Sequence, residues 1–262
     1  MPVITEASRL LDRILASTPE FHCRETEIKD WDRSQSLLSA EAKRNLLQDT
    51  RTCYSISPQF AHYLLSTVKA GMRTLETGAG TSTLVFAMGG ANHVAVTPDD
   101  REAKEITAYA AKLGIDLSHV VFALEPSDRY LPSATLPSLD LVLLDGKHAF
   151  PWPIVDWFYT AEALEKGGLL MLDDIQLPPV AILADFLKVD SRWAFEGCPG
   201  GRTAVFRKLS SSVHDVAWHM QNWTINEQLN SNTLWRRVSR IHSALRRRYR
   251  EYFQGLSRSP YS

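Results

Sequence analysis

The segment LETGAGTST, residues 75–83, decides the fold of this chain. An apolar, strand-like run reaches Glu76, two glycines follow at Gly78 and Gly80, and a helical run opens at Thr81. Two glycines allow a tight turn and a close approach of the backbone to a ligand, and the free N–H groups at a helix start face an anion. The segment predicts a strand, a ligand-binding turn and a helix; the alternative is a tight turn without a ligand.

On both sides of this turn, short apolar runs alternate with helical runs from residue 73 to about 208, which predicts an α/β sheet with parallel strands. Helices between the strands are expected to end at Gly114 and Gly167. The strands are expected at 73–76, 93–97, 119–124, 139–145 and 169–173, followed by a terminal antiparallel hairpin of 193–196 and 203–208. With right-handed crossovers, the prediction is a three-layer sheet of seven strands whose last strand is antiparallel.

The flanking segments predict helical extensions around this core. Residues 1–72 are expected to form an N-terminal helical cap over the ligand edge, in which Ser57 caps a helix and Pro58 is its first residue. Residues 73–208 are the predicted core. Residues 209–262 are predicted to be a C-terminal helical extension that ends in a basic amphipathic helix.

The composition is that of an ordinary globular protein: 262 residues, 44% hydrophobic and 23% charged, which excludes a disordered or collagen-like chain. The formal net charge of −1 gives no reason to expect nucleic acid or an anionic membrane as a partner of the whole chain. The net charge is small because two regions of opposite charge cancel. Residues 235–262 hold eight arginines and the single acid Glu251, and the rest of the chain has a formal net charge of −8. We expect the tail to dock on this acidic body; a second subunit, an anionic substrate and a membrane surface are the alternatives.

The three cysteines, Cys23, Cys53 and Cys198, are widely spaced and fit neither a disulfide framework nor a zinc site. Charged residues interrupt the segment 1–15 where a signal peptide needs an apolar stretch, and no run approaches the length of a bilayer span. A reducing, cytoplasmic location is therefore expected.

Thr83 stands where a dinucleotide fingerprint, GxGxxG, has its third glycine, which argues against NAD or FAD. An acid shortly before GxG, in five strand–helix units that end in a hairpin, instead resembles the class I S-adenosylmethionine-dependent methyltransferases. The resemblance covers about residues 73–208. It implies a Rossmann-like methyltransferase sheet with S-adenosylmethionine as cofactor, and it implies that the methionine part of the cofactor lies against the glycine turn.

The resemblance also implies a set of cofactor-binding residues along the carboxyl edge of the sheet. The chain departs from the family pattern after the second strand, where an acid commonly holds the ribose hydroxyls and this sequence has Thr97 and Pro98. Asp99 and Asp100 follow and can substitute, or they cap the next helix. The implied set is Glu76, Gly78, Ala79, Gly80, Thr81, Ser82, Thr97, Asp99, Ser127 and Asp145.

Two further strands end in acids, in LVLLDGKHAF at 141–150 and GGLLMLDDIQ at 167–176, so Asp145, Asp173 and Asp174 are expected to converge. Carboxylates that lie together repel and raise one another's pKa, so a cation or hydrogen-bond donors are expected among them. Oxygen ligands suit magnesium, calcium or manganese. The arrangement resembles the metal-dependent small-molecule O-methyltransferases of the catechol and macrocin types, which implies a magnesium site at these three aspartates.

His148 follows Asp145 by three residues, and the same resemblance makes it the candidate general base, paired with Asp145; Lys147 is the runner-up. Four aromatic residues near this edge are candidates to line an acceptor pocket or to lie over the cationic sulfonium: Tyr54, Phe150, Trp152 and Trp157. For Trp157 the alternative is a place in the core. The alternative is that Asp145 only orders the cofactor loop, that Asp173 or Asp174 caps a helix, and that His148 is a surface residue.

The function hypothesis is methyl transfer from S-adenosylmethionine to a hydroxyl of a small molecule, with or without a divalent metal such as Mg²⁺. The expected partner is a small-molecule methyl acceptor. Nucleic acid and a transmembrane segment are not expected. A homo-oligomer that forms through the helical extensions is expected. Two other classes stay open: a non-catalytic cofactor-binding or scaffold protein, and an NAD(P)-binding Rossmann oxidoreductase.

Overall fold

The computed structural model describes residues 6–17, 19, 21, 23–25, 51–53 and 55–226. The chain divides into two compact units, of which the larger comprises residues 1–188 and 192–214 and contains the sheet. The smaller unit comprises residues 189–191 and 215–262, and its described part includes the short helix η3 (Trp218–Met220). The predicted basic helix at 235–262 lies outside the described residues.

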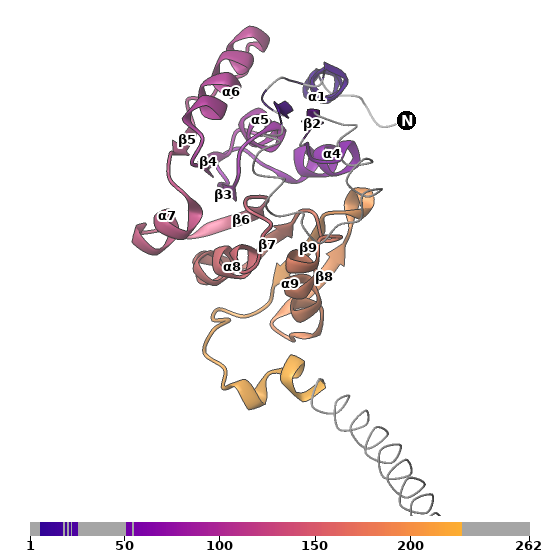
Figure 1. The fold of residues 1–262 in the computed structure, drawn as a ribbon, viewed down its shortest axis with the longest axis vertical. Helices are drawn as coiled ribbons and strands as arrows, with labels where there is room; N and C mark the ends of the chain where they lie inside the picture. Colours follow the sequence, from indigo (N-terminus) through magenta and orange to yellow (C-terminus); the bar gives the residue numbers. More distant parts are fainter. Residues whose placement is uncertain are drawn as a thin grey trace, which may run out of the picture. The chain divides into compact units, whose positions relative to one another are not determined.

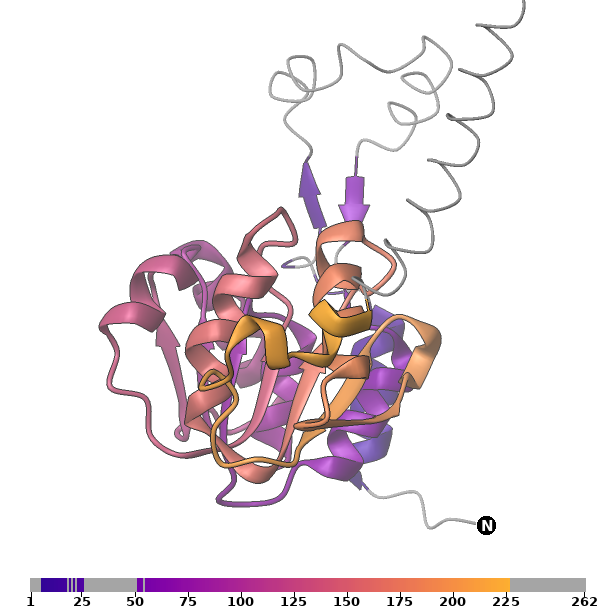
Figure 2. The same cartoon turned by 90° about the horizontal axis from the view of Figure 1, so that it is seen from below.

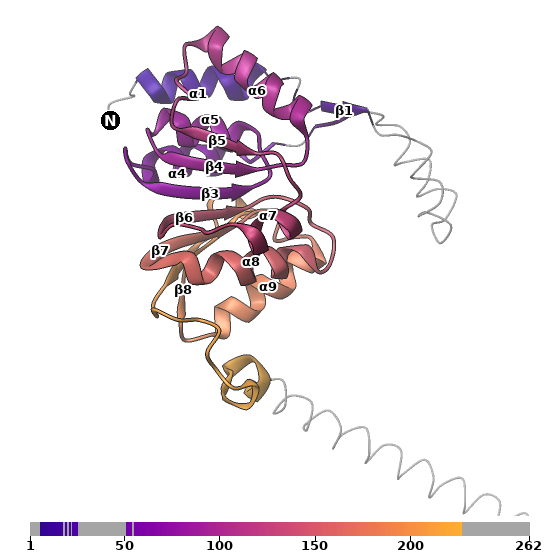
Figure 3. The same ribbon diagram turned by 90° about the vertical axis from the view of Figure 1, so that its left-hand side faces the viewer.

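The larger unit is built on a seven-stranded sheet in the order β5-β4-β3-β6-β7-β9-β8 (Figure 3). Strands β3 to β7 run parallel, and β9 runs antiparallel to both of its neighbours, β7 and β8. The predicted seven strands with an antiparallel last strand are therefore confirmed. The strands are β3 (Arg73–Thr77), β4 (Asn92–Val96), β5 (Val120–Ala123), β6 (Leu139–Leu144), β7 (Leu164–Leu172), β8 (Trp193–Gly197) and β9 (Ala204–Lys208).

Helices cover both faces of the sheet and make the predicted three layers (Figure 1). Alternate residues of a strand point to opposite faces. Leu141 and Leu143 of β6 accordingly pack in one apolar cluster with Phe60, whereas Val142 and Leu144 pack in another with helices of the opposite face. One face carries α1 (Glu6–Ser17), α4 (Pro58–Thr67), α5 (Thr81–Met88) and α6 (Asp100–Leu113); the other carries α7 (Ser127–Ser133), α8 (Trp152–Ala163) and α9 (Pro178–Val189).

Local signals in the sequence set two helix ends as expected and fail at a third. The hydroxyl of Ser57 accepts a hydrogen bond from the Phe60 N–H at 3.2 Å and caps α4. Gly114 ends α6 in the left-handed conformation, with φ 70°. The prediction that Gly167 ends α8 is wrong: the helix stops at Ala163 because Leu164 turns to extended backbone and pairs with β6.

Two short strands, β1 (Cys23–Glu25) and β2 (Arg51–Cys53), lie side by side as an antiparallel pair (Figure 2). A single 3-10 turn, η2 (Pro199–Gly201), joins β8 to β9. Within the part of the chain that the structure describes, no helix combines the length and the apolar character needed to cross a bilayer.

Candidate active site

The loops that follow the parallel strands line a cavity of about 820 Å³, a size typical of small-molecule sites. Its walls include residues 77–82 after β3, 96–99 after β4, 126–129 after β5 and 145–148 after β6. The N-terminal segment contributes Phe21, Ser55 and Ile56. The wall is completed by Glu102, Trp152, Asp174, Gln176 and Arg202. Ligands of open α/β sheets bind at this edge.

Gly78 is required by the packing of two loops against each other. It has φ 94°, and a Cβ atom there would lie 2.4 Å from the backbone oxygen of Asp145. Gly78 therefore makes room for the loop after β6, and it also lines the cavity, so the expectation that it allows the close approach of a ligand stays a prediction. A larger residue at position 78 would displace Asp145 as well as the turn.

Glu76 lies beneath the turn and not in the cavity wall. Its carboxylate is fully buried, accepts a hydrogen bond from the Thr83 hydroxyl, and lies 3.1 Å from Nε2 of His93. The Thr83 hydroxyl also accepts from the Gly80 N–H at 3.0 Å, so the residue in the third-glycine position ties the turn to β3. The expectation that Glu76 contacts a cofactor finds no support in this placement and stays a prediction. The remaining nine residues of the predicted set all line the cavity: Gly78, Ala79, Gly80, Thr81, Ser82, Thr97, Asp99, Ser127 and Asp145.

The carboxylate missing from the end of β4 is supplied by Glu102. Asp99 accepts hydrogen bonds from the N–H groups of Arg101 and Glu102, at 3.0 and 3.2 Å. It therefore caps α6, which was one of the two roles that the sequence left open for it. Glu102 Oε2 accepts from the Thr97 hydroxyl at 3.0 Å, and both residues line the cavity. The sequence analysis missed Glu102. Its signal was its position three residues after a capping aspartate, where a glutamate side chain folds back over the helix start.

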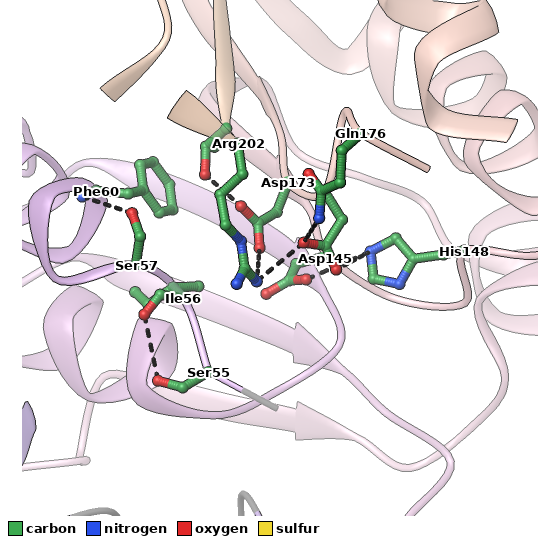
Figure 4. Close-up of polar contacts among 11 residues, drawn as sticks. Ser55, Ile56, Ser57, Phe60, Asp145, His148, Asp173, Gln176 and Arg202 are labelled. Atoms are coloured by element: carbon green, nitrogen blue, oxygen red, sulfur yellow. Dashed lines mark hydrogen bonds and ion pairs between the residues drawn. The ribbon is translucent and has the colours of Figure 1, made fainter. Parts of the chain in front are cut away.

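Arg202 holds the two aspartates that follow β7 (Figure 4). Its Nη2 atom lies 3.0 Å from Asp173 Oδ2 and 3.0 Å from Asp174 Oδ1. Asp174 has φ 58°, which is unusual for a residue other than glycine. In an extended strand the side chains of neighbouring residues point to opposite faces. The left-handed backbone at Asp174 breaks this alternation, and Asp173 and Asp174 both contact Arg202. Gln176 donates to the same Asp174 oxygen at 2.8 Å.

The three aspartates do not fit the magnesium site that the sequence suggested. Asp173 is fully buried, and both of its oxygens are engaged, one by Arg202 and the other by the Thr203 hydroxyl. Over the described residues, no group of three or more His, Cys, Asp or Glu side chains is arranged to hold a metal ion. The cation expected among these carboxylates is the guanidinium of Arg202.

His148 and Asp145 face each other at the cavity wall. Nε2 of His148 lies 3.6 Å from Asp145 Oδ1 and 3.9 Å from Asp174 Oδ2, and the two paired side chains are 25% and 23% exposed. The pKa of Asp145 is raised to about 7, mainly by burial and also by the charges of Asp173 and Glu76, against the opposing effect of His148. Burial would lower the pKa of His148, but Asp145, Asp174 and Asp173 outweigh it, so that pKa is raised.

Lys147, the runner-up base, lies at the same wall with its ammonium nitrogen 3.6 Å from the centre of the Trp152 ring. The order of the two candidates, with Lys147 behind His148, stays a prediction.

A further acid, Asp156 on α8, is buried behind the wall with no hydrogen-bond partner for Oδ1 in the described part of the chain. Burial raises its pKa to about 6, against the opposing effect of the Ser127 and Thr77 hydroxyls. No sequence pattern singled it out.

Arg202 was also missed in the sequence, and the strand register explains where it lies. Leu172 pairs with Ala204 in the antiparallel ladder of β7 and β9. The residues that precede β9 must therefore meet the residues that follow β7. A sequence reading that carried the antiparallel register two steps further would have placed Thr203 opposite Asp173 and Arg202 opposite Asp174.

Comparison with known proteins agrees with this fold. Residues 75–175 match a family model described as a methyltransferase domain. Among curated proteins, none matches the sequence. The fold is shared, at a TM-score of 0.53, with a Corynebacterium glutamicum protein (14% identity; 71% of this chain and 98% of that chain) and with cofactor-bound Rv0187 from MTB (14%; 71% and 97%). It is shared at the same score with a Klebsiella pneumoniae protein assigned as an O-methyltransferase (15%; 77% and 90%). At these identities the likeness concerns the fold alone.

Proposed function

We propose, on the premise that this chain carries a methyltransferase domain with the class I fold, that it transfers the methyl group of S-adenosylmethionine to a hydroxyl of a small molecule. One observation carries the proposal. The Asp145 and His148 side chains, which can take up a proton, face a cavity lined by the loops after β3, β4, β5 and β6. A hydroxyl acceptor needs such a group, because its oxygen becomes a good nucleophile only as its proton leaves.

The cavity fits the cofactor in size and in the kinds of groups that it offers. The turn at 77–82 and the first N–H groups of α5 suit a carboxylate, and Glu102 with Thr97 suits ribose hydroxyls. Ser127, the first residue of α7, also lines the cavity. When bound, S-adenosylmethionine supplies a methyl group on a positively charged sulfur. The chain's own contribution is to hold the reacting groups in one place.

His148 is the residue that takes the acceptor's proton. Its Nε2 atom is directed toward Asp145 and Asp174, which favours a hydrogen on that atom and leaves Nδ1 as the proton acceptor. The carboxylate of Asp145 then stabilises the charged imidazolium. The distance of 3.6 Å is longer than a hydrogen bond, and such contacts commonly shorten when a substrate binds.

The alternatives of the sequence analysis lose their support at specific residues. A non-catalytic protein was favoured by the missing acid after β4, and Glu102 supplies a carboxylate there. A dinucleotide-dependent oxidoreductase is opposed by Thr83, whose hydroxyl is used inside the turn, between Gly80 and Glu76.

The test is an isotope-transfer assay with the full chain and S-adenosylmethionine labelled in its methyl group. Phenols, catechols and sugar hydroxyls form one panel, and total RNA forms a second. We expect label in an extractable small hydroxyl compound, and none with the variant His148→Asn. Label in RNA alone would replace the proposed acceptor class; no transfer to either panel, together with turnover of NAD(P), would reject the reaction.

A further inference from the structure

The acidic cluster at the carboxyl edge has one arginine at its centre. A single nitrogen, Nη2 of Arg202, lies 3.0 Å from oxygens of both Asp173 and Asp174. The charge of Asp145 also acts on this guanidinium. Like charges this close are stable only with a counter-charge among them, and Arg202 provides it.

The backbone around Arg202 is held on two sides, so the guanidinium is part of the fold and not a mobile surface group. The Arg202 carbonyl accepts from the Ile175 N–H at 2.9 Å, which joins the loop before β9 to the loop after β7. On the other side, Gly200 packs on the start of α4: a Cβ atom at Gly200 would lie 2.0 Å from the Ser57 hydroxyl oxygen. The side chain is 35% exposed and lines the cavity.

We infer that Arg202 is the resident cation of this site: its guanidinium takes the place that a divalent metal ion would need among Asp145, Asp173 and Asp174, and the chain binds no metal there. A metal ion would require free carboxylate oxygens. Asp173 has none, because Thr203 and Arg202 occupy both oxygens, and Asp174 Oδ1 is shared between Arg202 and Gln176.

One consequence rests on the proposed function. Arg202 lines the cavity and holds Asp173 and Asp174 in place of a metal ion, so the reaction proposed above needs no metal at this cluster. Methyl transfer should then survive exhaustive treatment with EDTA.

The experiment is a titration of the metal-free full chain with Mn²⁺, followed by the electron paramagnetic resonance signal of the free ion. It needs no methyl acceptor, so its outcome is independent of the proposed reaction. We expect no stoichiometric binding by the wild type. In Arg202→Ala the carboxylates lose their counter-charge, and we expect one Mn²⁺ per chain, bound at least about tenfold more tightly than by the wild type.

Two further variants complete the design. Arg207→Ala removes an arginine of β9 that pairs with Glu196, away from the cluster, and should bind no more Mn²⁺ than the wild type. Arg202→Gln replaces Arg202→Ala if the latter does not fold. One Mn²⁺ bound by the wild type and lost in Asp174→Asn would overturn the inference. A folded Arg202 variant that gains no more Mn²⁺ than Arg207→Ala would overturn it as well.

Discussion

Two histidine–carboxylate pairs lie in this domain, one inside the sheet and one at the cavity wall, and they differ in burial, in distance and in hydrogen bonding. His93 and Glu76 are fully buried, with Nε2 and Oε1 3.1 Å apart. The other nitrogen of His93 lies 2.8 Å from the Thr74 hydroxyl, and its ring stacks on Phe86 with centroids 4.1 Å apart. His148 and Asp145 are about one quarter exposed, 3.6 Å apart, and line the cavity.

The difference separates a pair that stabilises the fold from a pair that can do chemistry. His93 uses both ring nitrogens within the protein and cannot reach a ligand. The Nε2 atom of His148 lies near the carboxylates of Asp145 and Asp174 without a hydrogen bond among the described residues, and these carboxylates raise the pKa of His148. A cavity-lining histidine with a raised pKa is a candidate to exchange protons with a substrate, through Nδ1 as proposed above.

The largest expected effect comes from removing the histidine of the exposed pair. In His148→Asn we expect kcat to fall by about 100- to 10,000-fold, because the general base is lost. The free energy of unfolding should change by less than about 1 kcal/mol, since the side chain is partly exposed. Activity measured by isotope transfer and stability measured by urea titration test both parts; a variant that keeps full kcat would mean that His148 is not the base.

Removing the histidine of the buried pair should give the opposite pattern. His93→Ala leaves the Glu76 carboxylate buried without this partner, and we expect a loss of about 3–5 kcal/mol in the free energy of unfolding. The kcat of the molecules that remain folded should stay within a few-fold of the wild type. A stable but inactive His93→Ala variant would show that the comparison assigns the two histidines wrongly.

Asp156 is a further buried acid, and no cationic side chain is paired with it in the described part of the chain. Burial raises the pKa of Asp156 to about 6, so the folded chain binds this proton more tightly than the unfolded chain does. The free energy of unfolding therefore falls as pH rises from about 4 to about 6. Above that range Asp156 is ionised in both states, and its destabilising effect on the fold no longer changes with pH. In Asp156→Asn we expect a gain of about 2 to 3 kcal/mol near pH 8 and a flatter pH dependence. Urea titrations across this range check it; equal slopes for both proteins would contradict it.

The last expected effect is the pH dependence of kcat/KM that the pair of His148 and Asp145 should produce. The pKa of Asp145 is raised to about 7 and that of His148 is raised as well, so a proton stays on the pair at mildly acidic pH. We expect kcat/KM to rise about tenfold per pH unit up to about pH 7 and to level off above it, because the base must first lose that proton. This rise of kcat/KM with pH should be absent from the residual activity of the variant His148→Asn. A flat wild-type profile across this range would speak against the pair.

Much of the fold could be predicted because periodic patterns report it directly. The strand ends, the Ser57 cap and the antiparallel hairpin follow from local sequence, and the resemblance to class I methyltransferases is confirmed at the level of domain and fold. The end of α8 was predicted wrongly because strand pairing at Leu164 outweighed the helical pattern.

The site could be predicted less completely, for a physical reason. Residues that follow parallel strands must meet at one edge, so Asp145, Asp174 and His148 were found. Glu102 reaches the same cavity from the first turn of a helix, and Arg202 reaches it from the residues before an antiparallel strand. Their signals, a position three residues after a helix cap and a strand register, do not by themselves indicate a binding site. The roles of all these residues, the domain boundaries, a cytoplasmic location and a homo-oligomer stay predictions.

The most direct test of the central claim is a calorimetric titration of the full chain with S-adenosylmethionine, with NAD⁺ as the comparison ligand. We predict one S-adenosylmethionine site per chain and no heat from NAD⁺. Glu102→Gln should weaken binding about tenfold, as expected for the loss of one charge-assisted hydrogen bond, whereas the matched control Glu105→Gln on the same helix should not. Tight binding of NAD⁺ without binding of S-adenosylmethionine would contradict the account.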